Sequence, residues 1–100
     1  MPKDVIDTFG FALYLAQIGE KHEQAKPLHG FGSAGVIEIA DSLRGNAYRA
    51  VYAVRFADAV YVLHCFQKKS TRGTRTPGPE MELIRERLAA ARLCSESERK

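Results

Sequence analysis

The chain has 100 residues, a net charge of +3 and a hydrophobic share of 45%. This length allows one domain with a modest core and excludes a large catalytic architecture with several cofactor subsites, while the hydrophobic share is too high for disorder. The two cysteines, Cys65 and Cys94, suggest no disulfide framework, and no apolar run approaches the ~18 residues of a membrane span. We therefore expect a single cytoplasmic domain over residues 1–100, with reduced thiols and neither a signal peptide nor a membrane partner.

The positive charge is concentrated in the middle of the chain. Residues 44–76 hold seven Lys or Arg against one Asp, a surplus of +6, whereas residues 1–43 sum to −3 and residues 77–100 to zero. A local surplus of this size is typical of a surface that binds a polyanion. We favour that interpretation over a solvated edge strand that is protected by cations.

The first predicted element is a helix from Pro2 to about Glu23. Apolar residues recur at helical spacing in two stripes, and this predicts a helix that is buried on more than one side. The stripes are Ile6, Phe9, Leu13 and Ala16, and Phe11, Leu15 and Ile18. Pro27 stops helical continuation, and the glycine-rich residues 28–35 are predicted to form a loop whose glycine spacing matches no phosphate-binding motif.

Three strands and a second helix follow. The strands are predicted at Val36–Ala40, Tyr48–Phe56 and Ala59–Lys68, joined by turns at Asp41–Asn46 and Ala57–Asp58. The helix opens at Pro79 and ends before a frayed tail over residues 96–100. The fold class is therefore α+β: a small antiparallel sheet of about three strands, with an N-terminal helix packed on it and a C-terminal helix.

Basic and aromatic residues alternate along the last two strands and the segment after them. Cations hold phosphates and aromatic rings stack on unpaired bases, so this mixture favours single-stranded RNA over duplex DNA. The candidates for RNA binding are Tyr48, Tyr52, Phe66, Arg72 and Arg75. His64 and Cys65 are neighbours on a strand and point to opposite faces, and no metal-ligand spacing occurs, so we expect no metal and no cofactor.

RNA also offers a metal-free reaction, in which a 2′-hydroxyl attacks the adjacent phosphate. Such a site needs cations for the phosphate and groups that exchange protons. The catalytic candidates are Arg49, His64, Lys68 and Lys69. Each has a structural alternative: a cross-strand ion pair for Arg49, an ordinary strand histidine for His64, which spacing alone favours, and a solvated strand end for the two lysines.

Several motifs together resemble the phage-derived HigB-like toxins of the RelE/ParE superfamily of type II toxin–antitoxin systems. The resemblance covers roughly residues 9–92 and includes Lys26-Pro27-Leu28, Glu38-Ile39, Tyr48-Arg49-x-x-Tyr52, Leu63-His64-x-Phe66-x-Lys68-Lys69 and the helix EMELIRERL. It implies a RelE-like fold and a ribosome-associated mRNA endonuclease, in which Arg49, Lys68 and Lys69 contact the scissile region. It also implies a helix-turn-helix antitoxin as partner. Operator DNA would be bound by the antitoxin and not by the toxin itself.

The sequence departs from this family in two respects. Related toxins usually begin with a strand before the first helix, so we expect either a truncated start or a sheet with one strand fewer. An exposed sheet edge would result, which dimerisation or a partner could cover. Several relatives place a Tyr or His near the C-terminus as an acid or base, whereas no Tyr or His follows His64 here. The proton donor is therefore open among His64, Lys68 and a group of the ribosomal RNA. A non-catalytic module that binds RNA, the antitoxin or another partner with the same basic surface is the alternative function.

Overall fold

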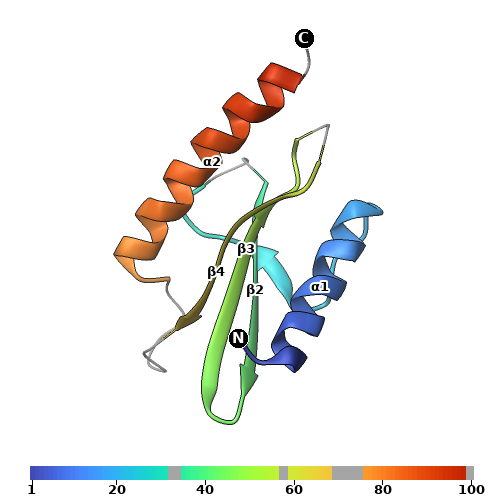
Figure 1. Cartoon of the computed structure of the whole chain (residues 1–100), viewed down its shortest axis with the longest axis vertical. Coiled ribbons are helices and arrows are strands. Elements are labelled where there is room, and N and C mark those ends of the chain that lie inside the picture. Colours follow the sequence, from blue (N-terminus) through green and yellow to red (C-terminus); the bar gives the residue numbers. More distant parts are fainter. Residues whose placement is uncertain (32–34, 57–58, 69–75, 99–100) are drawn as a thin grey trace.

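The computed structural model describes residues 1–31, 35–56, 59–68 and 76–98. The element order is α1 (Lys3–Gln17), β1 (Ala25–Pro27), β2 (Val36–Leu43), β3 (Asn46–Ala53), β4 (Tyr61–Lys68) and α2 (Gly78–Glu98). The four strands form an antiparallel sheet in the order β1-β2-β3-β4. Figure 1 shows that α1 and α2 lie on opposite sides of this sheet. The predicted α+β class is confirmed, with one strand more than expected.

Helix α1 ends earlier than predicted, and β1 begins only at Ala25. The Gly19 backbone is left-handed with φ +81°, its N–H donates to Ala16 O, and the Glu20 N–H donates to Leu15 O. These two bonds form a Schellman motif, which closes the helix at Gln17. The prediction that the helix continues to about Glu23 was wrong because Gly19 is the stop signal, and the chain then reverses into β1.

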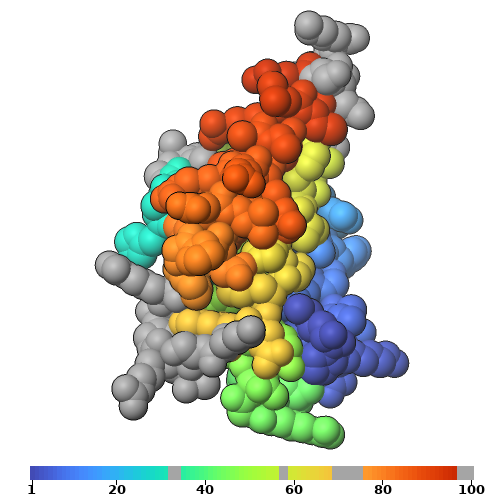
Figure 2. Space-filling model, turned by 60° about the vertical axis from the view of Figure 1, so that its left-hand side comes forward, coloured from blue at the N-terminus to red at the C-terminus, as the bar shows by residue number. Residues whose placement is uncertain are grey.

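Each face of the sheet carries its own hydrophobic core. On one face, the buried residues of α1 pack against β2 and β3; on the other, those of α2 pack against β2, β3 and β4. The first core contains Val5, Phe9, Ala12, Ile39, Tyr48, Ala50 and Tyr52, and the second contains Leu28, Val36, Val51, Ala53, Leu63, Ile84, Leu88 and Ala91. Figure 2 looks onto the second side, where α2 crosses the sheet beside β4.

The outer side of α1 differs from the prediction. Ile6, Phe11, Tyr14 and Ile18 are each more than half exposed. The α1 residues buried against the sheet are Val5, Phe9 and Ala12, because a single sheet face contacts α1 among the described residues. The expectation that α1 is buried on more than one side was therefore wrong.

The hairpin of β2 and β3 is longer than predicted and has a tighter turn. Leu43 pairs with Asn46, so the loop consists of Arg44 and Gly45, with φ values of 52° and 83°. Two positive φ values in a two-residue loop are typical of a type I′ turn, whose twist matches that of the flanking strands. The turn therefore needs only two of the six residues that the sequence analysis assigned to it.

A bulge interrupts the pairing of β3 with β4. Val51 pairs with His64, but the next residue, Tyr52, pairs with Val62, so β4 has one extra residue, Leu63. The extra residue breaks the regular alternation of a strand within β4: Leu63 joins the core under α2, and Val62 is 52% exposed. From His64 onward, every second residue of β4 shares a face with Arg49 and Val51 of β3.

Candidate functional site

Strand register brings four of the predicted site residues to the α2 side of the sheet. Arg49 pairs with Phe66, while Ala47 and Val51, its neighbours on the same face of β3, pair with Lys68 and His64. Phe66 packs against the core that α2 covers. Arg49, His64, Phe66 and Lys68 therefore share one face, as the sequence pattern requires for a common site.

Arg49 is the centre of a buried polar cluster. Its Nη1 donates to Thr76 Oγ1 at 3.0 Å and lies 3.4 Å from Glu38 Oε2. The other oxygen of Glu38, Oε1, lies 3.6 Å from Lys26 Nζ. Arg49 is 6% exposed and Glu38 4%. We call Lys26, Glu38, Arg49, Lys68 and Thr76 the Arg49 cluster.

Lys68 completes this cluster from β4. Its side chain is buried, and burial together with the positive charge of Arg49 lowers the pKa of the Lys68 ammonium, while Glu38 acts in the opposite direction. A lysine with a lowered pKa releases its proton more readily near neutral pH than an exposed lysine does. Lys68 can therefore act as a proton donor as well as a positive charge.

Glu38 and Thr76 are residues that the prediction of the site missed. Glu38 was noted only as part of a motif, although its position carried a signal: a single charge inside the apolar strand VIEIA. A buried carboxylate needs a positive or hydrogen-bonding partner, so such a residue points to a polar site. Thr76 lies two residues before α2, and nothing in its sequence context distinguishes it from an ordinary loop residue.

His64 connects β4 to α2. Its Nε2 contacts Glu80 Oε2 in the first turn of α2, and its Nδ1 lies 3.0 Å from Arg87 Nη1. The Arg87 Nη1 also donates to Leu63 O at 2.9 Å, and the His64 ring stacks on Phe66 at a centroid distance of 4.9 Å. Because both ring nitrogens have partners, proton exchange with RNA would require one of these contacts to break.

Replacing His64 with alanine should lower the stability of the fold. The change removes the contacts to Glu80 and Arg87, and each lost partner of a partly buried polar group costs about 1–3 kcal/mol. Thermal unfolding at neutral pH measures the effect. His29→Ala is the matched control, because His29 is exposed. Its free energy of unfolding should lie within about 0.5 kcal/mol of that of the wild type. Equal stabilities of the two variants would contradict the tethering role of His64.

Two predicted RNA-binding residues lie on the opposite face. Tyr48 is 6% exposed and Tyr52 2%, and both pack in the core under α1. Burial also raises the pKa of the Tyr52 hydroxyl. We correct their assignment: strand alternation places both rings away from Arg49, and their burial leaves no ring face for a base to stack on. Phe66 is on the side of Arg49, but its ring already stacks on His64.

Three predicted residues, Lys69, Arg72 and Arg75, lie outside the described residues. Within the described ranges, no group of three or more His, Cys, Asp or Glu side chains is placed to hold a metal ion. Neither α1 nor α2, as far as it is described, combines the length and the apolar character that a membrane-spanning helix needs.

The sequence matches a known protein family over most of its length. Residues 1–89 match the family described as Phage derived protein Gp49-like (DUF891). No curated protein and no solved structure matches the chain significantly. The matched residues include α1, all four strands and the first half of α2, and so all of the Arg49 cluster. The chain thus belongs to the Gp49-like family of phage-derived proteins, a family of RelE/HigB-like toxins.

Proposed function

We propose that the chain is the toxin of a type II toxin–antitoxin system and that it cleaves mRNA on the ribosome at the Arg49 cluster. The family is associated with the toxins of such systems. The observation that carries the proposal is the shared position of Arg49 and Lys68, a fixed cation beside a lysine with a lowered pKa. This combination suits a reaction that builds negative charge on a phosphate and needs a proton for its leaving group.

The proposed reaction needs no metal. The 2′-hydroxyl oxygen attacks the adjacent phosphorus and gives its proton to water, while the bond from phosphorus to the 5′-oxygen breaks. The Arg49 guanidinium stabilises the charge on the non-bridging oxygens, because its planar fork of N–H donors matches the geometry of phosphate oxygens. The Lys68 ammonium protonates the leaving 5′-oxygen. The products are a 2′,3′-cyclic phosphate and a 5′-hydroxyl.

The roles of the remaining predicted residues follow from their positions. His64 acts mainly as the tether between β4 and α2, because Glu80 and Arg87 occupy its two ring nitrogens. Lys69, Arg72 and Arg75 extend the positive charge that follows β4 in the sequence, and we assign them to the RNA backbone. The proposed partners are the ribosome with its mRNA and a helix-turn-helix antitoxin, which alone contacts operator DNA. The proposed location is the cytoplasm.

A second function uses the same surface without chemistry. Glu80 and Arg87 contact both ring nitrogens of His64, and no Tyr or His follows His64 in the sequence. These two observations favour a module that binds RNA or an antitoxin and does not cleave RNA. Such a module would show salt-sensitive binding, since each phosphate contact releases counterions. It would leave mRNA intact even on translating ribosomes.

Controlled expression in a bacterial host tests the proposed function. We expect growth to stop after induction, and primer extension to reveal cuts within translated reading frames. The same transcript with its start codon removed should stay intact, because the reaction requires the ribosome. Normal growth with intact mRNA at confirmed expression of the chain would contradict the endonuclease and would leave the binding module as the function.

A further inference from the structure

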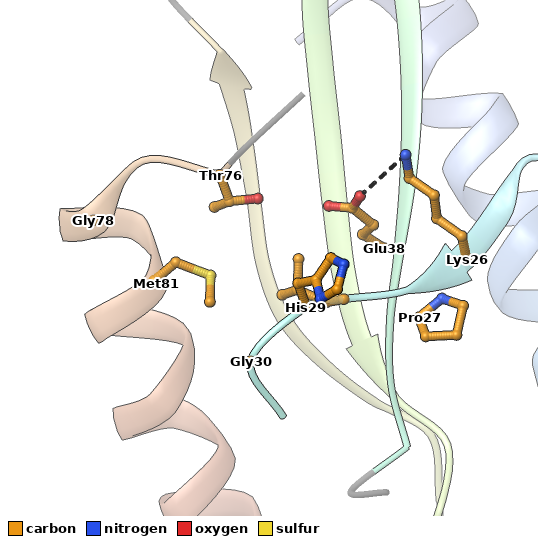
Figure 3. A pocket seen from close by; sticks show the side chains of 9 residues that line it. Lys26, Pro27, His29, Gly30, Glu38, Thr76, Gly78 and Met81 are labelled. Carbon is orange, nitrogen blue, oxygen red and sulfur yellow. Dashed lines mark ion pairs between the residues drawn. The ribbon is translucent and has the colours of Figure 1, made fainter. Parts of the chain in front are cut away.

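A cavity of about 770 Å³ lies next to the Arg49 cluster, between the segment that starts at β1 and the beginning of α2. Its lining is Lys26, Pro27, Leu28, His29, Gly30, Glu38, Thr76, Gly78 and Met81. Figure 3 shows Glu38 and Lys26 meeting at one end, with Thr76 opposite and Met81 on the α2 side. The volume falls within the range of small-molecule sites in proteins.

The cavity and the proposed cleavage site share Lys26, Glu38 and Thr76. Glu38 and Thr76 line the cavity, and the same two side chains contact Arg49 Nη1 at 3.4 Å and 3.0 Å. A nucleotide with its phosphate at Arg49 would therefore have the cavity within reach of its base. This step rests on the proposed function, because it takes the Arg49 cluster as the phosphate site.

The lining has the polarity of a nucleobase site. Pro27, Leu28 and Met81 offer apolar surface to the faces of a planar ring, and the exposed imidazole of His29 offers an aromatic face. At the polar end, a carboxylate acceptor and an ammonium donor lie side by side, with 3.6 Å between Glu38 Oε1 and Lys26 Nζ. Single-stranded RNA is read mainly through such contacts to the Watson–Crick edges of splayed bases.

Among the four bases, guanine fits this pair of groups best. Its Watson–Crick edge presents two adjacent donors, N1–H and N2–H, beside the acceptor O6. A carboxylate accepts two parallel hydrogen bonds, and an ammonium donates to a carbonyl oxygen. Adenine and cytosine present one amino group beside an acceptor nitrogen, and uracil presents one N–H between two carbonyls. Each of these bases would leave one carboxylate oxygen of Glu38 without a base donor.

We propose that this cavity is a guanine-binding subsite, in which Glu38 accepts from N1–H and N2–H and Lys26 donates to O6. Glu38 is then a specificity-determining residue, and the toxin prefers RNA with guanine next to the scissile phosphate. A bidentate contact of this kind typically discriminates between bases by about 10- to 100-fold. A mismatched base binds more weakly because it offers Glu38 one hydrogen bond where guanine offers two.

Calorimetric titration of the purified full chain with the four nucleoside 3′-monophosphates tests the proposal without ribosomes. We expect the guanosine nucleotide to bind about 10-fold or more tightly than the other three. Glu38→Gln should remove this preference, because the amide replaces one acceptor with a donor that opposes N1–H or N2–H. The control Glu82→Gln makes the same chemical change on an exposed position of α2 and should keep the preference.

A second variant covers the case in which Glu38→Gln does not fold. Lys26→Met alters a side chain that is 56% exposed, so the fold should persist while guanosine affinity falls. Equal binding of all four nucleotides by the wild type, or a guanosine preference that survives in either variant, would overturn the subsite. RNA cleavage without such a preference would leave the proposed function standing. Conversely, guanosine binding without cleavage would support the subsite and reject the endonuclease.

Discussion

Arg49→Ala is expected to abolish growth arrest and to slow mRNA cleavage by about 10²- to 10³-fold. This is the usual cost of removing one preorganised donor that stabilises charge in a transition state. Arg49 should show such a cost because its guanidinium is held in place by Glu38 and Thr76. Cleavage of a ribosome-bound message, followed over time with purified protein, measures the loss directly.

Arg49→Ala also affects folding, so two further variants are needed as controls. Removing Arg49 takes the nearest positive charge from the buried Glu38, and breaking a buried ion pair typically costs about 3–5 kcal/mol. Arg49→Lys keeps the charge and loses the planar fork, so it should remain folded and still cleave slowly. Arg44→Ala removes the same charge from the exposed turn between β2 and β3 and should retain full activity. A folded Arg49→Lys protein with undiminished cleavage would contradict the assigned role.

Replacing Lys68 separates proton donation from positive charge. Lys68→Met should stop cleavage because the leaving oxygen loses its proton donor. Lys68→Arg keeps the charge, but arginine does not give up its proton, so we expect this variant to be inactive as well. In the wild type, the cleavage rate should fall as pH rises through the lowered pKa of Lys68. Full activity of a folded Lys68→Arg protein would show that the charge alone is sufficient.

The stability of Lys68→Met provides an independent check on the buried lysine. The folded protein holds the Lys68 proton less tightly than the unfolded chain, whose pKa is near the ordinary value of 10.5. Between the lowered pKa and 10.5 the unfolded state binds more protons, so the wild type gains stability as pH rises through that window. The wild type should therefore gain stability relative to Lys68→Met over this range. Parallel pH profiles of the two proteins would contradict the lowered pKa.

Most of the fold could be predicted from the sequence, because most of its strands and helices have strong periodic patterns of apolar residues. Each of the three predicted strands overlaps an observed one, although β3 ends at Ala53 instead of Phe56 and β4 begins at Tyr61 instead of Ala59. Strand β1 could not be found this way, since Ala25–Pro27 is only three residues long and includes a proline. Its pairing with β2 is a tertiary contact that no local pattern encodes. Gly19 is a recognisable signal for a helix end. The prediction nevertheless extended the helix to about Glu23, because the apolar stripes continue to Ile18 and charged residues follow.

The candidate site was predictable in part. The concentration of basic residues along β3 and β4 predicted Arg49, His64 and Lys68 as one site, and the strand register places these three residues on one face of the sheet. Burial was not predictable from the same pattern, so Tyr48 and Tyr52 were assigned to RNA although they support α1. The contacts of His64 were also hidden, because Glu80 and Arg87 come from α2 and lie 16 and 23 residues away in sequence.

The chemical nature of the RNA ends tests the central claim most directly. Mass spectrometry of the fragments from ribosome-bound mRNA should find a 2′,3′-cyclic phosphate on one side of the cut and a 5′-hydroxyl on the other. A message with a 2′-O-methyl group on the nucleotide before the cut should remain whole, because its attacking hydroxyl is blocked. Cleavage of that methylated message, or fragments with a 5′-phosphate, would contradict attack by the 2′-hydroxyl at the Arg49 cluster.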